Sequence, residues 1–509
     1  MAVNSYGSHK YGTPPKYGPS VVTETVTKVL FDWSKTNNYV DETTNLVSFQ
    51  IKRGRKHYLS SSGSGFESDE TGKLTVVLEN IDDRFTAINE ASPLYPNVQS
   101  GRQVTILTYT AGGNFRRFTG IIQSVRTYGD SSGRKFARIE CADGWHVLRN
   151  SKRSISIALQ ENVYADDIIS AVLTAAAWPY ARALDSGVDL IPFWWTESPS
   201  ASKLISDITQ AELGLAWVAA DGTFVFHNRF HSEDVFASLT GDNIDIDSLS
   251  DSNPLDNIRN LTRVTAAPIY KTSEVTLWEL AGATILLQAA GEDATVEIFG
   301  EFSYNLSPVA ATECVTPVQV TDYEVYTTES GPGTDLTSQV VITAYFFSSG
   351  FKLLIHNQSG QAGYVRTLRV RGKALATGST IAFTEQDLAS VYDLAEFHLS
   401  SKWIQNPNAA RQMAKSLLSR LKSPRSDYTF GVVGVSDYVL FALDLGQRLS
   451  IASTEAGING AYRVIYIDSS YDADSGRPDV VKITVEPLPG TSGSGSTLPV
   501  TLPFTLGSS

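Results

Sequence analysis

The sequence predicts a mainly β, multidomain protein with two β-barrels, a small α+β module and an inserted β-sandwich. Three observations lead to this prediction. The chain has 509 residues, too many for one ordinary domain. Alternating apolar and polar residues, rich in β-branched side chains, run through most of it, whereas helical spacing occurs only in short segments. Two β segments, one near each end, also share a pattern of residues.

These changes of pattern divide the chain into seven segments. In order they are an N-terminal arm (1–24), a first β-barrel domain (25–150), an α+β module (151–240), an inserted β-sandwich (241–385), a helical segment (386–425), a second β-barrel domain (426–489) and a flexible C-terminal tail (490–509). The arm repeats Tyr-Gly and holds too few apolar residues to fold alone. It either adheres to a neighbour or has no structural role.

The first barrel domain is predicted from six alternating segments with turn residues between them and no helix. The segments are VTKVLFDW, LVSFQIKRG, KLTVVLENI, QVTILTYT, FTGIIQSVRTY and KFARIECAD. Before the fourth segment, Pro93 and Pro96 predict an ordered loop, because proline lacks the N–H that a strand needs for pairing.

Two amphipathic segments, 164–178 and 198–213, predict helices in the module, which Pro179 and Gly214 end. Asp221-Gly222 predicts a tight hairpin after them. Seven more alternating segments predict the β-sandwich, and Asn406-Pro407 begins a last helix.

The segment that begins at Gly101 resembles the one that begins at Gly446. Each opens with glycine, reaches an Ala-Gly-x-Asn turn, continues as an apolar strand, and meets a Ser-Gly-Arg turn before another alternating strand. We interpret this likeness as a duplicated barrel. A ring of three such chains would present six similar units and fit a six-fold object.

Composition excludes several classes of protein. The net charge of −13 argues against a reader of duplex DNA, although an acidic wall would let a passing duplex slide without sticking. Only 19% of residues are charged, which suggests that partners cover part of the surface. Two distant cysteines, Cys141 and Cys314, are expected to be free thiols. Neither a secretory signal nor a membrane segment is expected, so we place synthesis in the cytoplasm.

No residue is predicted to be catalytic, to bind a cofactor or to ligate a metal, because the signature motifs of hydrolases and nucleotide-binding proteins are absent. His227 and His231 have the nearest metal-like spacing, but we expect a surface loop pair. Oxygen atoms for a hard cation are offered by Asp32, Asn38 and Asp41, in what we interpret as an ordinary solvated loop.

Three further groups have two interpretations each. The positive run Lys52-Arg53-x-Arg55-Lys56 marks a solvated edge strand or faces an acidic seam on a neighbouring subunit. Trp194-Trp195 is interpreted as core in preference to an exposed platform. The sandwich aromatics that suit either a plain core or a glycan site are Tyr323, Tyr326, Phe346 and Phe347.

The segment GKLTVVLENIDDRFTAINEASPLYPNVQSGRQVTI resembles a recurring segment of bacteriophage minor tail proteins of the baseplate-hub, or tail-tip hub, family. The matching positions are Asn80, Asp83, Arg84, Phe85, 92–97 and 101–106. The helix segment SSKWIQNPNAARQMAKSLLSRLKSPR is also similar to the family's pattern. Relatives often carry an acidic, calcium-loop-like motif after the first strand, of which only Asp32 and Trp33 remain here.

The resemblance implies a structural, non-enzymatic protein of the virion tail tip, with two tail-tube-like barrels and other domains between them. It would act as a homotrimeric adaptor between a six-fold tube and a three-fold tip, and form the channel wall for DNA ejection. Its implied partners are a distal tail protein or tail tube protein, the tape measure protein, tail fibre or receptor-binding proteins, and genomic DNA only in passage.

Three alternatives stay open from the sequence. The sandwich would make the chain a binder of a host receptor or glycan. A hexameric distal tail protein would need only one ring-forming barrel in each chain. A hydrolase with an unrecognised site is the third.

Overall fold

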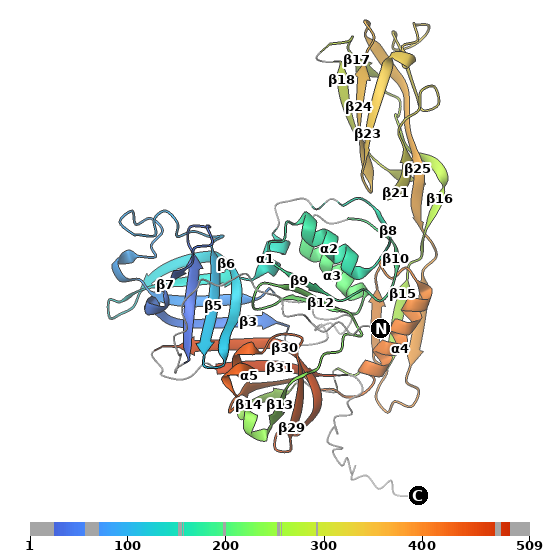
Figure 1. The fold of residues 1–509 in the computed structure, drawn as a ribbon. Coiled ribbons are helices and arrows are strands. Elements are labelled where there is room, and N and C mark those ends of the chain that lie inside the picture. The colour runs from blue at the N-terminus through green and yellow to red at the C-terminus, as the bar shows by residue number, and fades with distance from the viewer. Residues whose placement is uncertain are drawn as a thin grey trace, which may run out of the picture.

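The computed structural model describes residues 25–55, 71–150, 155, 157–196, 200–251, 255, 257–291, 294–473 and 480–488. The predicted arm (1–24) and tail (490–509) lie outside these residues. Figure 1 shows strands from both ends of the chain side by side in one body, a helical module next to it, and a β-domain that projects away. The predicted mainly β, multidomain fold is confirmed.

One 13-stranded sheet joins the two ends of the chain. The first unit contributes β1 (Val26–Asp32), β2 (Val40–Asp41), β3 (Leu46–Gly54), β4 (Lys73–Glu79), β5 (Gln103–Thr110), β6 (Gly113–Gly129) and β7 (Lys135–Ala142). The second unit contributes β13 (Val235–Thr240), β14 (Ile244–Asp251), β28 (Tyr428–Val432), β29 (Arg448–Ser453), β30 (Ile458–Asp472) and β31 (Val480–Pro487). All six strands predicted for the first domain form. The expected two barrels are open among the described residues: β3 pairs with β30 of the other unit and not with β1, and β14 pairs with β28 and not with β13.

The second unit is assembled from two separated parts of the chain. β13 pairs in parallel with β29, and β14 pairs antiparallel with β28. This unit therefore begins at Val235, ahead of the expected boundaries at 240 and 426. Pairing between distant segments decides its membership, and alternation within a short segment carries no information about which distant strand it will pair with.

The loop between β4 and β5 is ordered, as predicted, and the residues of the family resemblance have structural roles in it. The Asn80 side chain accepts a hydrogen bond from the backbone N–H of Phe85 at 2.7 Å. Phe85 is fully buried in the core of the first unit. Arg84 donates to both carboxylate oxygens of Glu42, at 2.7 and 3.1 Å. The motif therefore fixes this loop against the unit's core.

The module is built around one apolar core. Its elements are α1 (Gly144–Arg149), β8 (Gln160–Val163), α2 (Ala165–Ala175), β9 (Arg182–Leu184), β10 (Ile191–Trp194), α3 (Ala201–Ala211), β11 (Leu215–Val218) and β12 (Phe224–His227). The core also takes in α4 (Pro407–Leu421), β15 (Leu261–Ala266), β26 (Ile381–Gln386) and β27 (Glu396–Ser400). Trp194 is fully buried there, which confirms its interpretation as core.

The end of α3 differs from the prediction in one residue. The left-handed conformation falls on Leu213, with a φ of 55°, and not on Gly214. Gly214 is still required for space, because a Cβ atom there would lie 2.6 Å from the carbonyl oxygen of His227. The glycine thus lets the helix end approach β12 closely.

The projecting domain is a sandwich that runs from Ile269 to Thr377, narrower than the expected 241–385, because β14, β15 and β26 pair in other sheets. Its strands are β16 (Ile269–Glu279), β17 (Ile285–Leu287), β18 (Thr295–Glu301), β19 (Ser303–Tyr304), β20 (Ser307–Pro308), β21 (Ala311–Val315), β22 (Tyr323–Tyr326), β23 (Val340–Phe346), β24 (Gly350–Asn357) and β25 (Gly363–Thr377). A sheet around β25 packs on the sheet β18-β24-β23. Tyr323 is buried in this core, whereas Phe347 is 47% exposed.

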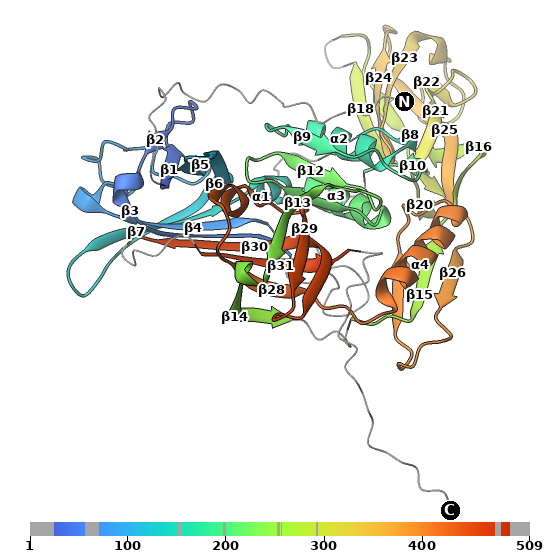
Figure 2. The same cartoon turned by 60° about the horizontal axis from the view of Figure 1, so that its bottom comes forward.

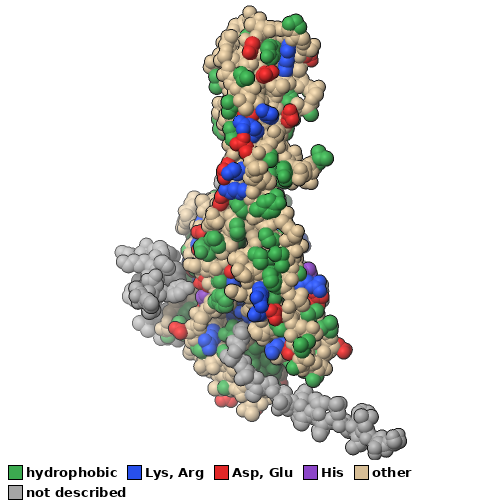
Figure 3. Space-filling model, turned by 90° about the vertical axis from the view of Figure 1, so that its right-hand side faces the viewer, with side chains coloured by type: hydrophobic (Ala, Val, Ile, Leu, Met, Phe, Trp, Pro, Cys, Tyr) green, Lys and Arg blue, Asp and Glu red, His purple; other side chains and the backbone are tan. Residues whose placement is uncertain are grey.

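Charged pairs fasten the sandwich to the module at the neck between them. Lys271 of β16 contacts Glu161 of β8 at 2.8 Å and Glu313 of β21 at 2.9 Å. Figure 3 shows positive and negative side chains gathered along this neck. Among the described residues no helix is long and apolar enough to span a bilayer.

Candidate assembly interface and histidine cluster

The two units share one topology. Strand order is β1-β5-β6-β7-β4-β3 in the first unit and β13-β29-β30-β31-β28-β14 in the second, and the six strands follow one another along the chain in the same sequence in both. Only the first strand differs, because β1 runs antiparallel to β5 whereas β13 runs parallel to β29. The duplication predicted from the sequence is present as a repeated strand order, in units that are not closed barrels.

The two glycines that open the repeated segments occupy equivalent positions. Gly101 and Gly446 have φ values of 75° and 81°. The N–H of Gly101 donates to the carbonyl of Ile122 at 2.8 Å, and that of Gly446 to the carbonyl of Val464 at 2.9 Å. Strand register shifts directly after Ile122 and after Val464. The same turn and the same bulge therefore recur in both units.

β3 and β30 join the units. They pair antiparallel from Ser48↔Asp472 to Gly54↔Tyr466, so that β3 is paired on both edges. At the end of the join Gly54 has a φ of 88°, and a Cβ atom there would lie 2.1 Å from the carbonyl oxygen of Ile465. The next residue, Arg55, donates its N–H to that same oxygen at 2.9 Å.

Buried charges stabilise this join. Glu486 is 1% exposed and lies near three guanidinium groups, those of Arg463 (Nε donates at 2.8 Å), Arg425 (3.5 Å) and Arg55 (3.8 Å). Burial by itself would raise the pKa of Glu486, but the arginines outweigh it and lower the pKa to about 2. Arg53 of the first unit pairs with Asp444 of the second.

The positive run is therefore neither a solvated edge nor a seam toward another subunit. Arg53 and Arg55 are 3% and 4% exposed, and their carboxylate partners belong to the second unit of the same chain. Lys52 lies on the opposite face, 3.9 Å from Asp468. Lys56 is outside the described residues.

The joined sheet has one apolar and one polar face. Phe49 and Ile51 face the core of the first unit, and Ile467 and Val481 face that of the second. Figure 2 shows strands of both units as one continuous layer. A groove on this face is lined from both units by polar side chains, among them Gln50, Arg138, Ser470 and Asp472, and also by Val77 and Val480.

Two of the open strand edges among the described residues are equivalent to the edges that form the internal join. β14, the equivalent of β3, pairs only with β28. Residues 124–129 of β6 extend beyond its last pair with β5, Gln103↔Ile121, and pair only with β7. These residues are the equivalent of the part of β30 that receives β3. The equivalents of the two strand segments that form the internal join, β14 and residues 124–129 of β6, therefore each have an edge without a paired strand among the described residues.

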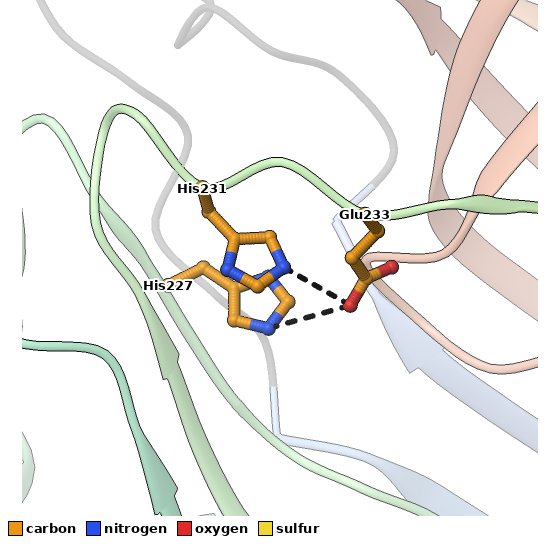
Figure 4. Close-up of side chains that lie close together, drawn as sticks. All are labelled: His227, His231 and Glu233. Atoms are coloured by element: carbon orange, nitrogen blue, oxygen red, sulfur yellow. Dashed lines mark ion pairs between the residues drawn. The ribbon is translucent and has the colours of Figure 1, made fainter. Parts of the chain in front are cut away.

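A histidine cluster lies where the module meets the second unit (Figure 4). The rings of His227 and His231 stack with centroids 3.3 Å apart. Their Nε2 atoms lie 3.6 and 3.1 Å from Oε1 of Glu233. The expected surface loop pair is wrong, since His227 is only 6% exposed. The spacing of the histidines in the sequence did not indicate Glu233. This residue joins the cluster because the loop after β12 folds back toward the two rings.

The surroundings shift the pKa values of the two histidines in opposite directions. Burial, together with the charge of His231, lowers the pKa of His227 to about 3. His231 is partly buried, which opposes its charge, but Asp185 and Glu233 raise its pKa to about 9. Asp185 lies 2.6 Å from Nδ1 of His231.

The other sequence candidates are occupied by structural contacts. The Asp32 carboxylate accepts the backbone N–H groups of Thr36 at 3.1 Å and Asn37 at 2.8 Å. Asp41 pairs with Lys28 at 2.9 Å. Cys141 and Cys314 are free thiols, as predicted, and burial raises the pKa of both.

No protein-family model matches the chain, and no curated protein does. Solved structures do match. A tail protein from Neisseria meningitidis MC58 aligns with 12% identity and a TM-score of 0.50, over 91% of this chain and 96% of that one. The 43 kDa tail protein of prophage MuSo2 from Shewanella oneidensis aligns with 9% identity and a TM-score of 0.49, over 90% and 96%. Prophage tail protein gp18 from Listeria monocytogenes EGD-e aligns with 8% identity and a TM-score of 0.44, over 90% and 94%.

The first of these similarities spans nearly all of both chains. At such low identity it shows a shared fold, and the chain has the fold of a phage-type tail protein. The resemblance predicted from the sequence is confirmed at that level.

Proposed function

We propose that this chain is a structural, non-enzymatic subunit of a phage tail tip that works as a homotrimer. The observation that carries the proposal is the internal join, in which two equivalent units pair through β3 and β30. A contact between two equivalent units that uses different surfaces of each is heterologous, and repeated heterologous contacts generate rings.

Repetition of the join between chains would close such a ring. β14 of one copy would add to residues 124–129 of β6 in the next copy, as β3 adds to β30 within the chain. Three chains would then present six similar units around one axis. Six copies of the same chain would present twelve, which disfavours the hexameric distal tail protein as an alternative.

Such a ring would adapt a six-fold tail tube or distal tail protein to a three-fold tip. The polar face of the joined sheet would line the channel, where DNA passes during ejection without being read. It carries both signs of charge, with Lys52 beside Asp468 and Arg138 beside Glu140, in place of the acidic wall expected from the net charge. The tape measure protein and tail fibre or receptor-binding proteins would be its other neighbours, in a tail tip assembled in the host cytoplasm.

The mass of the full chain in solution tests this proposal. One chain has a mass of 55.3 kDa, and native mass spectrometry is expected to find three copies in each particle. Only single chains, or six-copy rings, would contradict the proposal.

Ile246→Asp tests the proposed contact itself. Ile246 is 44% exposed on the open strand β14 between two aspartates, and another buried charge at a strand pairing should raise the trimer dissociation constant at least ~10-fold. Leu286→Asp is the matched control, since Leu286 is also 44% exposed but lies on the sandwich. Equal trimer stability in the two variants, measured by sedimentation, would place the contact elsewhere.

A further inference from the structure

We infer that His227, His231 and Glu233 bind one divalent transition-metal ion of the zinc class. Their ligand atoms all lie within 4.8 Å of one another. Tetrahedral zinc, with ligands at about 2.0–2.1 Å, holds them about 3.3 Å apart. The Glu233 oxygen is 3.1 Å from Nε2 of His231 and 3.6 Å from Nε2 of His227, on either side of that value. The two rings are stacked, with 11° between their planes, so the ring of His227 must turn before both Nε2 lone pairs can point at one ion.

The second ring nitrogen of His231 is already held as a metal-binding histidine requires. Its Nδ1 lies 2.6 Å from Oδ2 of Asp185, a geometry in which Nδ1–H donates to the carboxylate. That bond directs the lone pair of Nε2 toward Glu233 and fixes the ring, which is the usual outer contact of a metal-bound histidine. Nε2 of His231 is buried, and it lies 3.1 Å from the Glu233 carboxylate, which is the other ligand proposed on that side of the site.

The charges around the site suit a divalent ion. Binding of the ion would displace the proton from Nε2 of His231, because a ligating imidazole is neutral, and the carboxylates of Asp185 and Glu233 would together balance two positive charges. Two nitrogen ligands and one oxygen ligand favour zinc over calcium or magnesium, which prefer oxygen. The fourth position would take a water molecule, because Glu233 is one-third exposed on its side of the site.

The ion would act at a junction of the chain. His227 ends β12 of the module, and Glu233 lies two residues ahead of β13 in the second unit. Trp217, in the core of the second unit, packs its ring against His227 at 4.7 Å. A bound ion would therefore fasten the connection between the module and the sheet. This inference does not depend on the proposed function.

Cobalt titration of the full chain tests the inference. After treatment with EDTA and dialysis, the protein is expected to bind one Co²⁺ per chain with the strong visible absorption of tetrahedral cobalt, and Zn²⁺ should displace it. Glu233→Gln and His231→Gln should weaken binding at least ~100-fold, and Asp185→Asn by ~10- to 100-fold. His398→Gln, an exposed histidine on β27, should bind like the parent chain.

Circular dichroism of each variant shows whether it has folded, and Glu233→Gln is the variant least able to disturb packing because its side chain is partly exposed. Cobalt binding that is weak, or that has the pale spectrum of six-fold coordination, would overturn the inference. Binding that is equal in the parent chain and in folded Glu233→Gln would overturn it as well. The particle mass of the same samples reports separately on the trimer.

Discussion

Replacement of Glu486 by glutamine is expected to destabilise the second unit by about 3–5 kcal/mol, because it leaves buried arginines without their shared counter-charge. Glutamine keeps the shape of the side chain and can keep an oxygen toward Arg463, but it then turns a donor toward the guanidinium of Arg425. Arg55 and Arg425 lose the same partner, so the join between the units is weakened together with the unit itself.

Hydrogen exchange resolved to β30 and β31 measures this loss better than a single melting temperature, since a protein of several domains does not unfold in one step. Glu455→Gln, an exposed position in the same unit, is the control and should change stability by less than about 0.5 kcal/mol. Unchanged exchange in Glu486→Gln would mean that the charge of Glu486 is not needed to stabilise the three arginines.

The effect of pH provides an independent check on the same residue. The folded pKa of Glu486 is about 2, below its ordinary value of 4.5. Its contribution to stability is therefore complete above pH 4.5 and is lost as the pH falls through about 2, where the folded form also takes up a proton. The parent chain should lose about 3 kcal/mol more than Glu486→Gln across this window.

Local patterning predicted more of the fold than of the contacts between distant segments. The six strands of the first unit have strong alternation, and Gly101 and Gly446 open segments long enough for their likeness to be recognised. β13 and β14 are short, and β14 carries three aspartates, so alternation alone does not assign them to the second unit. Their membership depends on pairing with β29 and β28, which lie near the far end of the chain.

The same limit explains the errors at charged residues. Alternation correctly placed Arg53 on a strand, but no local signal shows that this strand receives a partner from the far end of the chain and buries the arginine. At the histidines, the spacing between His227 and His231 was visible in the sequence. The loop that adds Glu233 folds back because of how the module packs against the second unit, and Asp185 comes from a separate segment that directly follows β9.

Gly54→Ala is expected to destabilise the join between the units, that is, the pairing of β3 with β30, by about 3 kcal/mol or more. The methyl group would have to move a backbone carbonyl, that of Ile465, from a distance of 2.1 Å, and the φ of 88° is itself unfavourable for alanine. Gly133→Ala separates the two causes, because Gly133 has a similar φ of 83° with no atom within 4 Å of the added Cβ. Gly133→Ala should lower stability by only about 1–2 kcal/mol, because its only unfavourable feature is an alanine in the left-handed conformation.

Hydrogen exchange in β3 and β30 measures the opening, and native mass spectrometry measures its effect on assembly. Because the join sets the spacing between the two units, Gly54→Ala should also form fewer trimers, whereas Gly133→Ala should assemble normally. If both variants weaken β3 and β30 equally, backbone strain alone would account for the loss, and close packing at Ile465 would not be what holds the units together. If Gly54→Ala opens the join and still assembles fully, the ring must be set by contacts other than a repeat of the β3–β30 pairing.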